Sequence, residues 1–169
     1  MPTPIGVTRD YRLAPVGPEV RNARPVGDLV CARTSPMRFR VHLELFAKKL
    51  VLLLPAGIGV APPHEREGAY VTSGRCVYPL RTREPTGVIE VATQRPVTVG
   101  DLFRVWGQPL GTRRLAGFRS NRPVLSFVNG RRVPGDPRAI PLRRHDEIVL
   151  EIGGYVVPHT SYLFPKIAQ

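Results

Sequence analysis

The chain has 169 residues, of which 42% are hydrophobic, so it is long enough to bury the core of one globular domain. Its formal net charge of +12 favours a polyanionic partner such as nucleic acid, an anionic membrane surface or a cell-wall polymer. The charge is spread along the sequence, which argues against a basic nucleic-acid-binding tail, and the aliphatic run Leu50–Leu54 is far too short to span a bilayer.

The N-terminal region is rich in proline. Prolines at positions 2, 4, 15, 18, 25 and 36 occur without sustained hydrophobic periodicity, which predicts an extended arm over residues 1–36. Met1–Pro4 lead into polar sequence rather than into the apolar segment of a signal peptide. We therefore expect either a cytosolic protein or a chain whose leader has been removed.

Residues 37–54 have the pattern of a β-hairpin. Apolar and polar residues alternate from Arg38 to Leu45, as expected for a strand with one buried face. A tight turn is expected near Ala47–Lys49, and Pro55 ends the second strand because proline cannot donate to a strand ladder.

The following segment, residues 57–87, predicts an inserted loop, because glycine, proline and polar residues interrupt any regular period. Short strands are expected at Cys76–Leu80 and Val88–Val91. Pro85 and Gly87 mark the turn between these two strands.

The next elements carry clearer local signals. Thr98–Asp101 resembles a capping box with Asp in the usual Glu position, which predicts a short helix through Trp106 that Gly107 can end. Trp106 is expected in the core. Asn129-Gly130 between two apolar runs predicts a hairpin, and the alternation in residues 146–153 predicts a last strand.

The order of these elements predicts an α+β fold. A hairpin, a crossing segment, one helix, a second hairpin and a final strand follow one another as in the β-grasp (ubiquitin-like) fold, in which one helix packs across a mixed sheet. We expect this domain to cover residues 37–154, with a basic loop at 113–122. Residues 155–169 then form a tail that wraps over the surface.

Two pairs of arginines suggest a binding site. Residues two apart in a strand point to the same face, so Arg38 and Arg40 form one pair of neighbouring guanidinium groups and Arg81 and Arg83 form another. If the two strands are neighbours, four cations converge, which normally implies a bound anion, paired carboxylates or an acidic partner. The alternative is that these groups face solvent or pair with glutamates, namely Glu44, Glu84 and Glu90.

The only cysteines are Cys31 and Cys76. Their spacing leaves two alternatives open, namely a disulfide that joins the arm to the domain and a pair of buried free thiols. A two-cysteine metal site is disfavoured because the sequence has no CxxC pair.

Several segments of the chain form a recognisable set: Pro55–Val60, Cys76, Pro85–Val91, Thr98–Leu110 with its ending Val-Trp-Gly-Gln-Pro-Leu, Val128–Gly130, Gly135–Leu142 and His145–Ile148. In these segments the chain resembles a family of exported bacterial proteins, mostly from actinobacteria and soil bacteria, of uncertain function. The family pattern has His-x-His-x-His in the first strand and Leu-His-Thr-His-Asp in the later loop. These histidines resemble a transition-metal site.

The chain departs from that pattern at the histidines themselves. His42 remains, but Arg38, Arg40, Arg81 and Arg83 stand at the other histidine positions and Glu84 replaces the Asp. Arginine has no lone pair to offer a metal, so we expect no metal and no cofactor at these positions. Because the relatives are exported, the resemblance also implies an extracytoplasmic location and a disulfide between Cys31 and Cys76.

The sequence thus predicts a non-enzymatic domain that binds an anionic ligand or an acidic partner. Arg38, Arg40, Arg81 and Arg83 would hold the anion, His42 would donate a hydrogen bond, and Glu84 would orient one guanidinium group. One alternative is a basic, cytosolic nucleic-acid-binding accessory protein. Another is a metalloenzyme that uses His42 with carboxylates.

Overall fold

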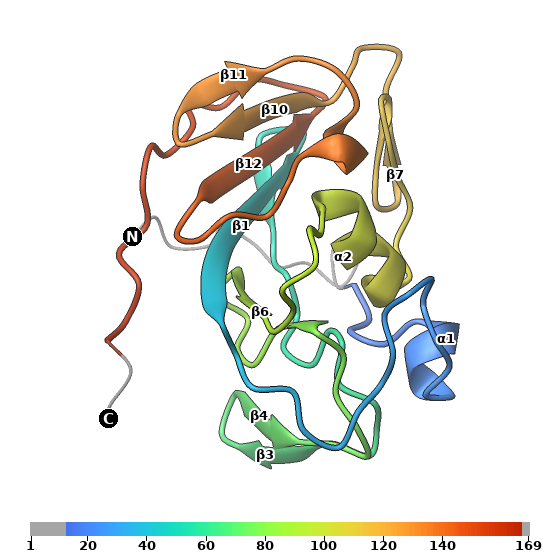
Figure 1. The fold of residues 1–169 in the computed structure, drawn as a ribbon. Coiled ribbons are helices and arrows are strands. Elements are labelled where there is room, and N and C mark those ends of the chain that lie inside the picture. Colours follow the sequence, from blue (N-terminus) through green and yellow to red (C-terminus); the bar gives the residue numbers. More distant parts are fainter. Residues whose placement is uncertain (1–12, 167–169) are drawn as a thin grey trace.

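The computed structural model describes residues 13–166. Their centre is a seven-stranded mixed sheet in the order β11-β10-β12-β1-β6-β5, with β2 also paired to β1. Helix α2 (Val99–Trp106) lies on one side of this sheet and the C-terminal segment lies on the other (Figure 1). The predicted α+β class is therefore confirmed.

The central strand β1 (Phe39–Ala47) organises the sheet. It pairs in parallel with β12 (Glu147–Ile152) and antiparallel with β2 (Leu50–Leu52), which confirms the predicted first hairpin and last strand. The edge of β1 opposite β12, which also carries β2, pairs antiparallel with β6 (Val88–Val91), and β6 pairs with β5 (Leu80–Arg81). Segments from both halves of the chain therefore meet on β1.

The second hairpin is also as predicted. Strands β10 (Leu125–Val128) and β11 (Arg131–Val133) pair antiparallel around Asn129 and Gly130, which have φ values of 52° and 79°. Two consecutive positive φ values are the requirement of a type I′ turn, and Asn-Gly meets it with little strain.

Helix α2 begins and ends as its sequence predicts. Thr98 Oγ1 accepts a hydrogen bond from the Asp101 backbone, the Asp101 carboxylate accepts one from the Thr98 backbone, and Gly107 ends the helix with φ 76°. Trp106 is fully buried, and its indole N–H donates to the carbonyl of Ala14 over 2.9 Å. The apolar side of the helix and alternate residues of β1 form the main core.

Several short elements were not expected. They are α1 (Pro18–Arg21), β3 (Glu65–Glu67), β4 (Tyr70–Ser73), β7 (Leu110–Gly111), β8 (Arg114–Leu115), β9 (Phe118–Arg119) and the 3-10 helix Pro137–Ala139. The expected basic loop thus contains the end of a three-stranded sheet, β7-β8-β9. The strand expected at Cys76–Leu80 is wrong in its bounds, because Pro79 interrupts it and only Leu80 and Arg81 pair with β6.

The predicted disulfide is present. Cys31 and Cys76 are bonded, with their Cα atoms 5.4 Å apart, and the neighbouring residues Ala32 and Val77 form an antiparallel bridge. Residues 13–36 of the expected arm are held further by the Tyr78 hydroxyl, which donates to the carbonyl of Arg24 over 2.5 Å. The rest of that arm, residues 1–12, and residues 167–169 of the expected tail lie outside the described residues. No helix within residues 13–166 has the length and apolar character needed to cross a membrane.

Candidate functional site

The polar residues of β1 lie on the face of the sheet that is turned away from α2. Alternation along the strand directs Val41, Leu43 and Leu45 into the main core, so the residues between them occupy the other face. His42 is there beside Glu147, its register partner on β12. The parallel pairing of two strands far apart in sequence therefore brings an imidazole and a carboxylate together.

The His42 ring is hydrogen-bonded at both nitrogens and is only 4% exposed. Its Nε2 lies 2.7 Å from the backbone oxygen of Thr86, and its Nδ1 lies 2.6 Å from Oε2 of Glu147. Because a carbonyl can only accept, the bond to Thr86 assigns a hydrogen to Nε2. Gly87 permits this approach, since its φ is 83° and a Cβ there would lie 2.9 Å from His42 Nε2 and 2.5 Å from the Leu43 carbonyl oxygen.

Glu147 is fully buried at the bottom of this site. Its Oε1 is buried and has no hydrogen-bond partner among the described residues. Burial raises the pKa of Glu147, the His42 ring opposes that shift, and the nearby carboxylate of Glu44 adds to it. Glu44 Oε1 lies 3.7 Å from His42 Nδ1, so two carboxylates face one ring nitrogen.

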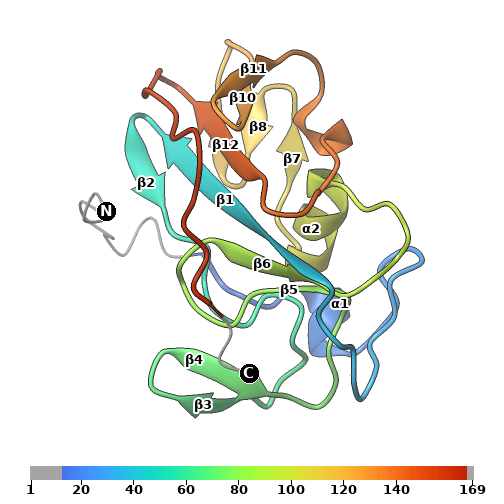
Figure 2. The same ribbon diagram turned by 60° about the vertical axis from the view of Figure 1, so that its left-hand side comes forward.

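The C-terminal segment covers these three side chains. The ring of Tyr162 stacks on His42 with 3.6 Å between centroids and 9° between planes, and Nδ1 of His159 lies 2.8 Å from Oε2 of Glu44. Figure 2 shows this segment passing over β1. Burial raises the pKa of the Tyr162 hydroxyl, with a smaller contribution from the charge of Glu147.

Two of the four predicted arginines meet at one carboxylate. Nε of Arg81 and Nε of Arg83 lie 2.7 and 3.4 Å from Oε2 of Glu90. Arg81, only 3% exposed, also donates to the backbone oxygens of Ser35 and Tyr78. Arg83 donates to the backbone of β4. Both guanidinium groups thus have partners within the fold, as in the ion-paired alternative.

The other predicted residues are placed separately. Arg40 on β1 is the register partner of Glu90 on β6. Its side chain points elsewhere: Nη2 donates to the carbonyl of Pro165 over 2.6 Å, and the guanidinium lies over the Phe164 ring. Arg38 and Glu84 are exposed, and neither side chain makes a hydrogen bond or ion pair within residues 13–166. The structure therefore brings Arg81 and Arg83 together and gives Arg38 no contact with them.

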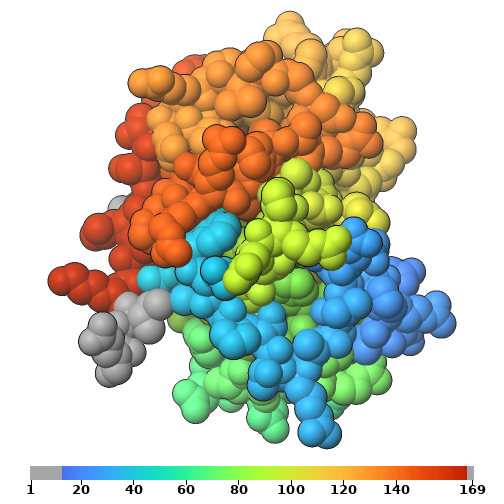
Figure 3. Space-filling model, in the orientation of Figure 1, coloured from blue at the N-terminus to red at the C-terminus, as the bar shows by residue number. Residues whose placement is uncertain are grey.

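A hollow of about 400 Å³ opens where β1 begins. The residues that line it include Phe39, Arg95, Arg143 and Arg144. The guanidinium of Arg144 lies 5.7 Å from the Phe39 ring centroid and donates to the backbone oxygen of Arg38 over 3.0 Å. Figure 3 shows the light-blue, yellow-green and orange segments that contribute these residues meeting on one face.

Sequence reasoning missed most of the residues gathered at His42 and at this hollow. Glu44 follows His42 by two positions, so the strand alternation by itself places both on one face. Glu147 and Tyr162 carry no such signal, because only the tertiary structure brings β12 and the C-terminal segment to β1. Arg143 and Arg144 precede the last predicted strand, and no motif in the sequence marks them as ligand-binding residues.

No family model, curated protein or solved structure matches the chain. The residues and contacts described above therefore carry the functional argument.

Proposed function

We propose that this chain is a non-enzymatic binding domain for an anionic ligand or an acidic partner, and that the hollow at the start of β1 holds the anionic group. The observation that carries this proposal is the lining of the hollow. Three arginines line it, and the described residues contribute no carboxylate to it. Guanidinium groups gathered around a hollow that has no carboxylate in its lining favour a ligand with negative oxygens.

The contacts of the arginines favour the hollow as the binding site over a site formed by the four arginines that were predicted from the sequence. Arg81 and Arg83 share the Glu90 carboxylate and also donate to backbone oxygens of the fold, so we assign them a structural role. The Arg144 guanidinium lies over the Phe39 ring, and its Nη2 donates to the carbonyl of Arg38. The other N–H groups of this guanidinium can bind an oxyanion. Arg38 thus stays in the proposed site, where it positions Arg144 through its backbone.

The distribution of acidic residues also supports an anionic partner. Glu147 and Glu151 are fully buried, and Glu90 lies between two arginines. Arg143 and Arg144 are both exposed, and neither forms an ion pair within residues 13–166. Of the lining arginines only Arg95 has one, an exposed pair with Asp28 at 2.8 Å, which is of small energetic value.

The fold type and the location are part of the proposal. A first hairpin, a parallel pairing of the first and last strands and a helix packed on the sheet support a β-grasp arrangement. The disulfide supports an extracytoplasmic location, because such bonds persist in oxidising compartments.

Thermal unfolding against phosphate, sulfate, citrate and short oligonucleotides tests the proposed function. A ligand that binds only the folded state stabilises it by about 2.7 kcal/mol at 100 times its Kd, so the melting temperature should rise. We expect Arg143→Ala/Arg144→Ala to abolish the rise caused by a small anion.

The matched control is Arg131→Ala/Arg132→Ala. This variant also removes two adjacent exposed arginines, one of which lies over an aromatic ring, Phe127. An equal loss in both variants, or no rise with any small anion, would contradict the proposal. A rise with oligonucleotides alone would favour the nucleic-acid alternative.

A further inference from the structure

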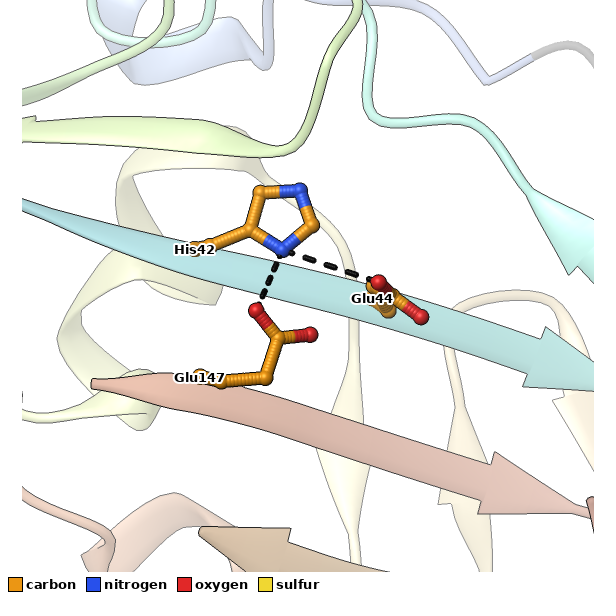
Figure 4. A group of neighbouring side chains, drawn as sticks. All are labelled: His42, Glu44 and Glu147. Atoms are coloured by element: carbon orange, nitrogen blue, oxygen red, sulfur yellow. Dashed lines mark hydrogen bonds and ion pairs between the residues drawn. The ribbon is translucent and has the colours of Figure 1, made fainter. Parts of the chain in front are cut away.

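We infer that His42, Glu44 and Glu147 form a binding site for one divalent transition-metal ion of the Zn²⁺ type, beneath the C-terminal segment. This inference goes beyond the proposed anion binding and uses none of its residues. One ligand atom from each of the three side chains lies within 4.8 Å of the other two. Figure 4 shows His42 and Glu44 on β1 and Glu147 on the neighbouring β12, with both carboxylates next to the same nitrogen of the His42 ring.

The tautomer of His42 makes its Nδ1 the available ligand. Thr86 O accepts from Nε2 at 2.7 Å, so the neutral ring directs the lone pair of Nδ1 toward Glu147. A backbone carbonyl that binds the distal ring N–H is the usual outer partner of a metal-bound histidine. The hydrogen bond to Thr86 therefore orients the ring for metal binding.

The close approach of the His42, Glu44 and Glu147 side chains requires a positive charge between them. Nδ1 and Oε2 of Glu147 are 2.6 Å apart, and two acceptors at that separation require a proton or a cation between them. One proton satisfies that contact alone. That proton gives no partner to the buried Oε1 of Glu147, which has none among the described residues. It also does not compensate the charge of the nearby Glu44. A divalent cation compensates both carboxylates and gives the buried oxygen a partner.

The donor set selects the class of cation. One imidazole nitrogen with two carboxylates suits Zn²⁺ and similar ions, whereas Mg²⁺ and Ca²⁺ prefer all-oxygen sites. Zn²⁺ binds nitrogen and oxygen ligands at about 2.0–2.2 Å. In tetrahedral geometry such bonds place two ligand atoms about 3.3 Å apart. Nδ1 and Oε2 must therefore separate by roughly 0.7 Å from 2.6 Å, which side-chain rotation can supply.

The C-terminal segment completes the surroundings of the site. Nδ1 of His159 lies 2.8 Å from Oε2 of Glu44, so it holds one carboxylate oxygen while Oε1 lies toward His42. Tyr162 covers the His42 ring and limits the access of water. Both contacts fix ligand orientation, which metal sites require from their outer partners.

Zinc titration of the native protein tests this inference. Tag-free protein, treated with chelator, dialysed and kept oxidised, is titrated with Zn²⁺ in a calorimeter and by native mass spectrometry. Oxidation matters because both cysteines are in the disulfide and their thiols then cannot compete. We expect one equivalent to bind with a Kd below about 10 μM, which corresponds to roughly 7 kcal/mol. We expect no such binding of Mg²⁺.

Variants identify the ligands. Glu44→Gln and Glu147→Gln should each weaken Zn²⁺ binding at least about tenfold, the lower bound for loss of an orienting group. The matched control is His64→Gln, since His64 Nε2 also bonds a backbone carbonyl, that of Val60, but has no carboxylate partner within residues 13–166. The affinity of the His64→Gln variant for Zn²⁺ should equal that of the native protein.

Two results would overturn the inference. One is the absence of stoichiometric binding by the native protein, which would leave a proton-bridged His42–Glu147 pair as the account of the site. The other is binding that survives Glu44→Gln unchanged. Glu44 is partly exposed, so we expect Glu44→Gln to fold. This variant therefore tests the metal site even if Glu147→Gln fails to fold. Anion binding at the hollow is measured separately, and its failure would not affect this result.

Discussion

Nε of Arg81 donates to Oε2 of Glu90 over 2.7 Å, across the pairing of β5 with β6. The Arg81 side chain is 4% exposed and the Glu90 side chain 17% exposed, so the ion pair is screened weakly by solvent. The same carboxylate oxygen faces Nε of Arg83. This ion pair holds the irregular segment around residues 57–87 to the edge of the main sheet.

Glu90→Gln should lower the free energy of unfolding by about 3 kcal/mol. The substitution removes the charge that compensates the buried Arg81, and breaking a buried pair from one side typically costs 3–5 kcal/mol. Urea unfolding followed by fluorescence of the single, buried Trp106 measures the loss. Glu84→Gln is the control, because Glu84 is exposed, and it should change stability by less than about 0.5 kcal/mol. Equal effects of the two variants would show that the pair contributes nothing.

Thr98→Ala should destabilise the protein by about 1 kcal/mol. The hydroxyl of Thr98 caps α2 by accepting from the backbone of Asp101, and loss of an N-cap side chain typically costs that amount. Thr98→Ser keeps the oxygen and should retain most of the stability. Chemical denaturation of both variants distinguishes loss of the cap from loss of the methyl group, since a large loss in the Ser variant would point to packing.

Reduction of the disulfide should lower stability by about 4 kcal/mol. Cys31 and Cys76 are 45 residues apart, and in the chain-entropy model a closed loop of this length restricts the unfolded chain by that amount. Denaturation of Cys31→Ser/Cys76→Ser against the native protein measures the effect. The intact mass of the native protein should also rise by the mass of two hydrogen atoms on reduction. An unchanged mass would refute the bond.

Stability should fall as pH rises through the titration of Glu151. This residue is fully buried, and burial raises its pKa above the ordinary 4.5, so the folded state binds its proton more tightly than the unfolded state. Between pH 4.5 and that raised pKa the folded state therefore holds more protons, and the free energy of unfolding decreases with pH, by up to about 1.4 kcal/mol per pH unit.

Glu151→Gln should remove this part of the pH dependence, because the amide does not titrate. The difference between the native and variant stability curves, measured from pH 4 to pH 8, isolates the contribution of Glu151. Glu67→Gln is the control, since Glu67 is exposed in β3, and its curve should follow that of the native protein. A difference curve that rises with pH would contradict the assignment.

Local signals in the sequence predicted the elements that local physics determines. The capping residues of α2, the Asn129-Gly130 turn and the alternation of β1 each act within a few residues, so their structures match the predictions. The short sheet β7-β8-β9 escaped detection because each of its strands is two residues long. No period can be read from so few positions.

The sequence by itself determined the α+β class, the main hairpins, the helix and the basic character of this protein, because these follow from nearby residues and from composition. Only the tertiary structure decided which charges meet. Glu90 engages Arg81 and Arg83, and the parallel pairing of β1 with β12 places Glu147 beside His42. Such contacts join residues separated by up to 105 positions, and their formation depends on strand order and register rather than on any local preference.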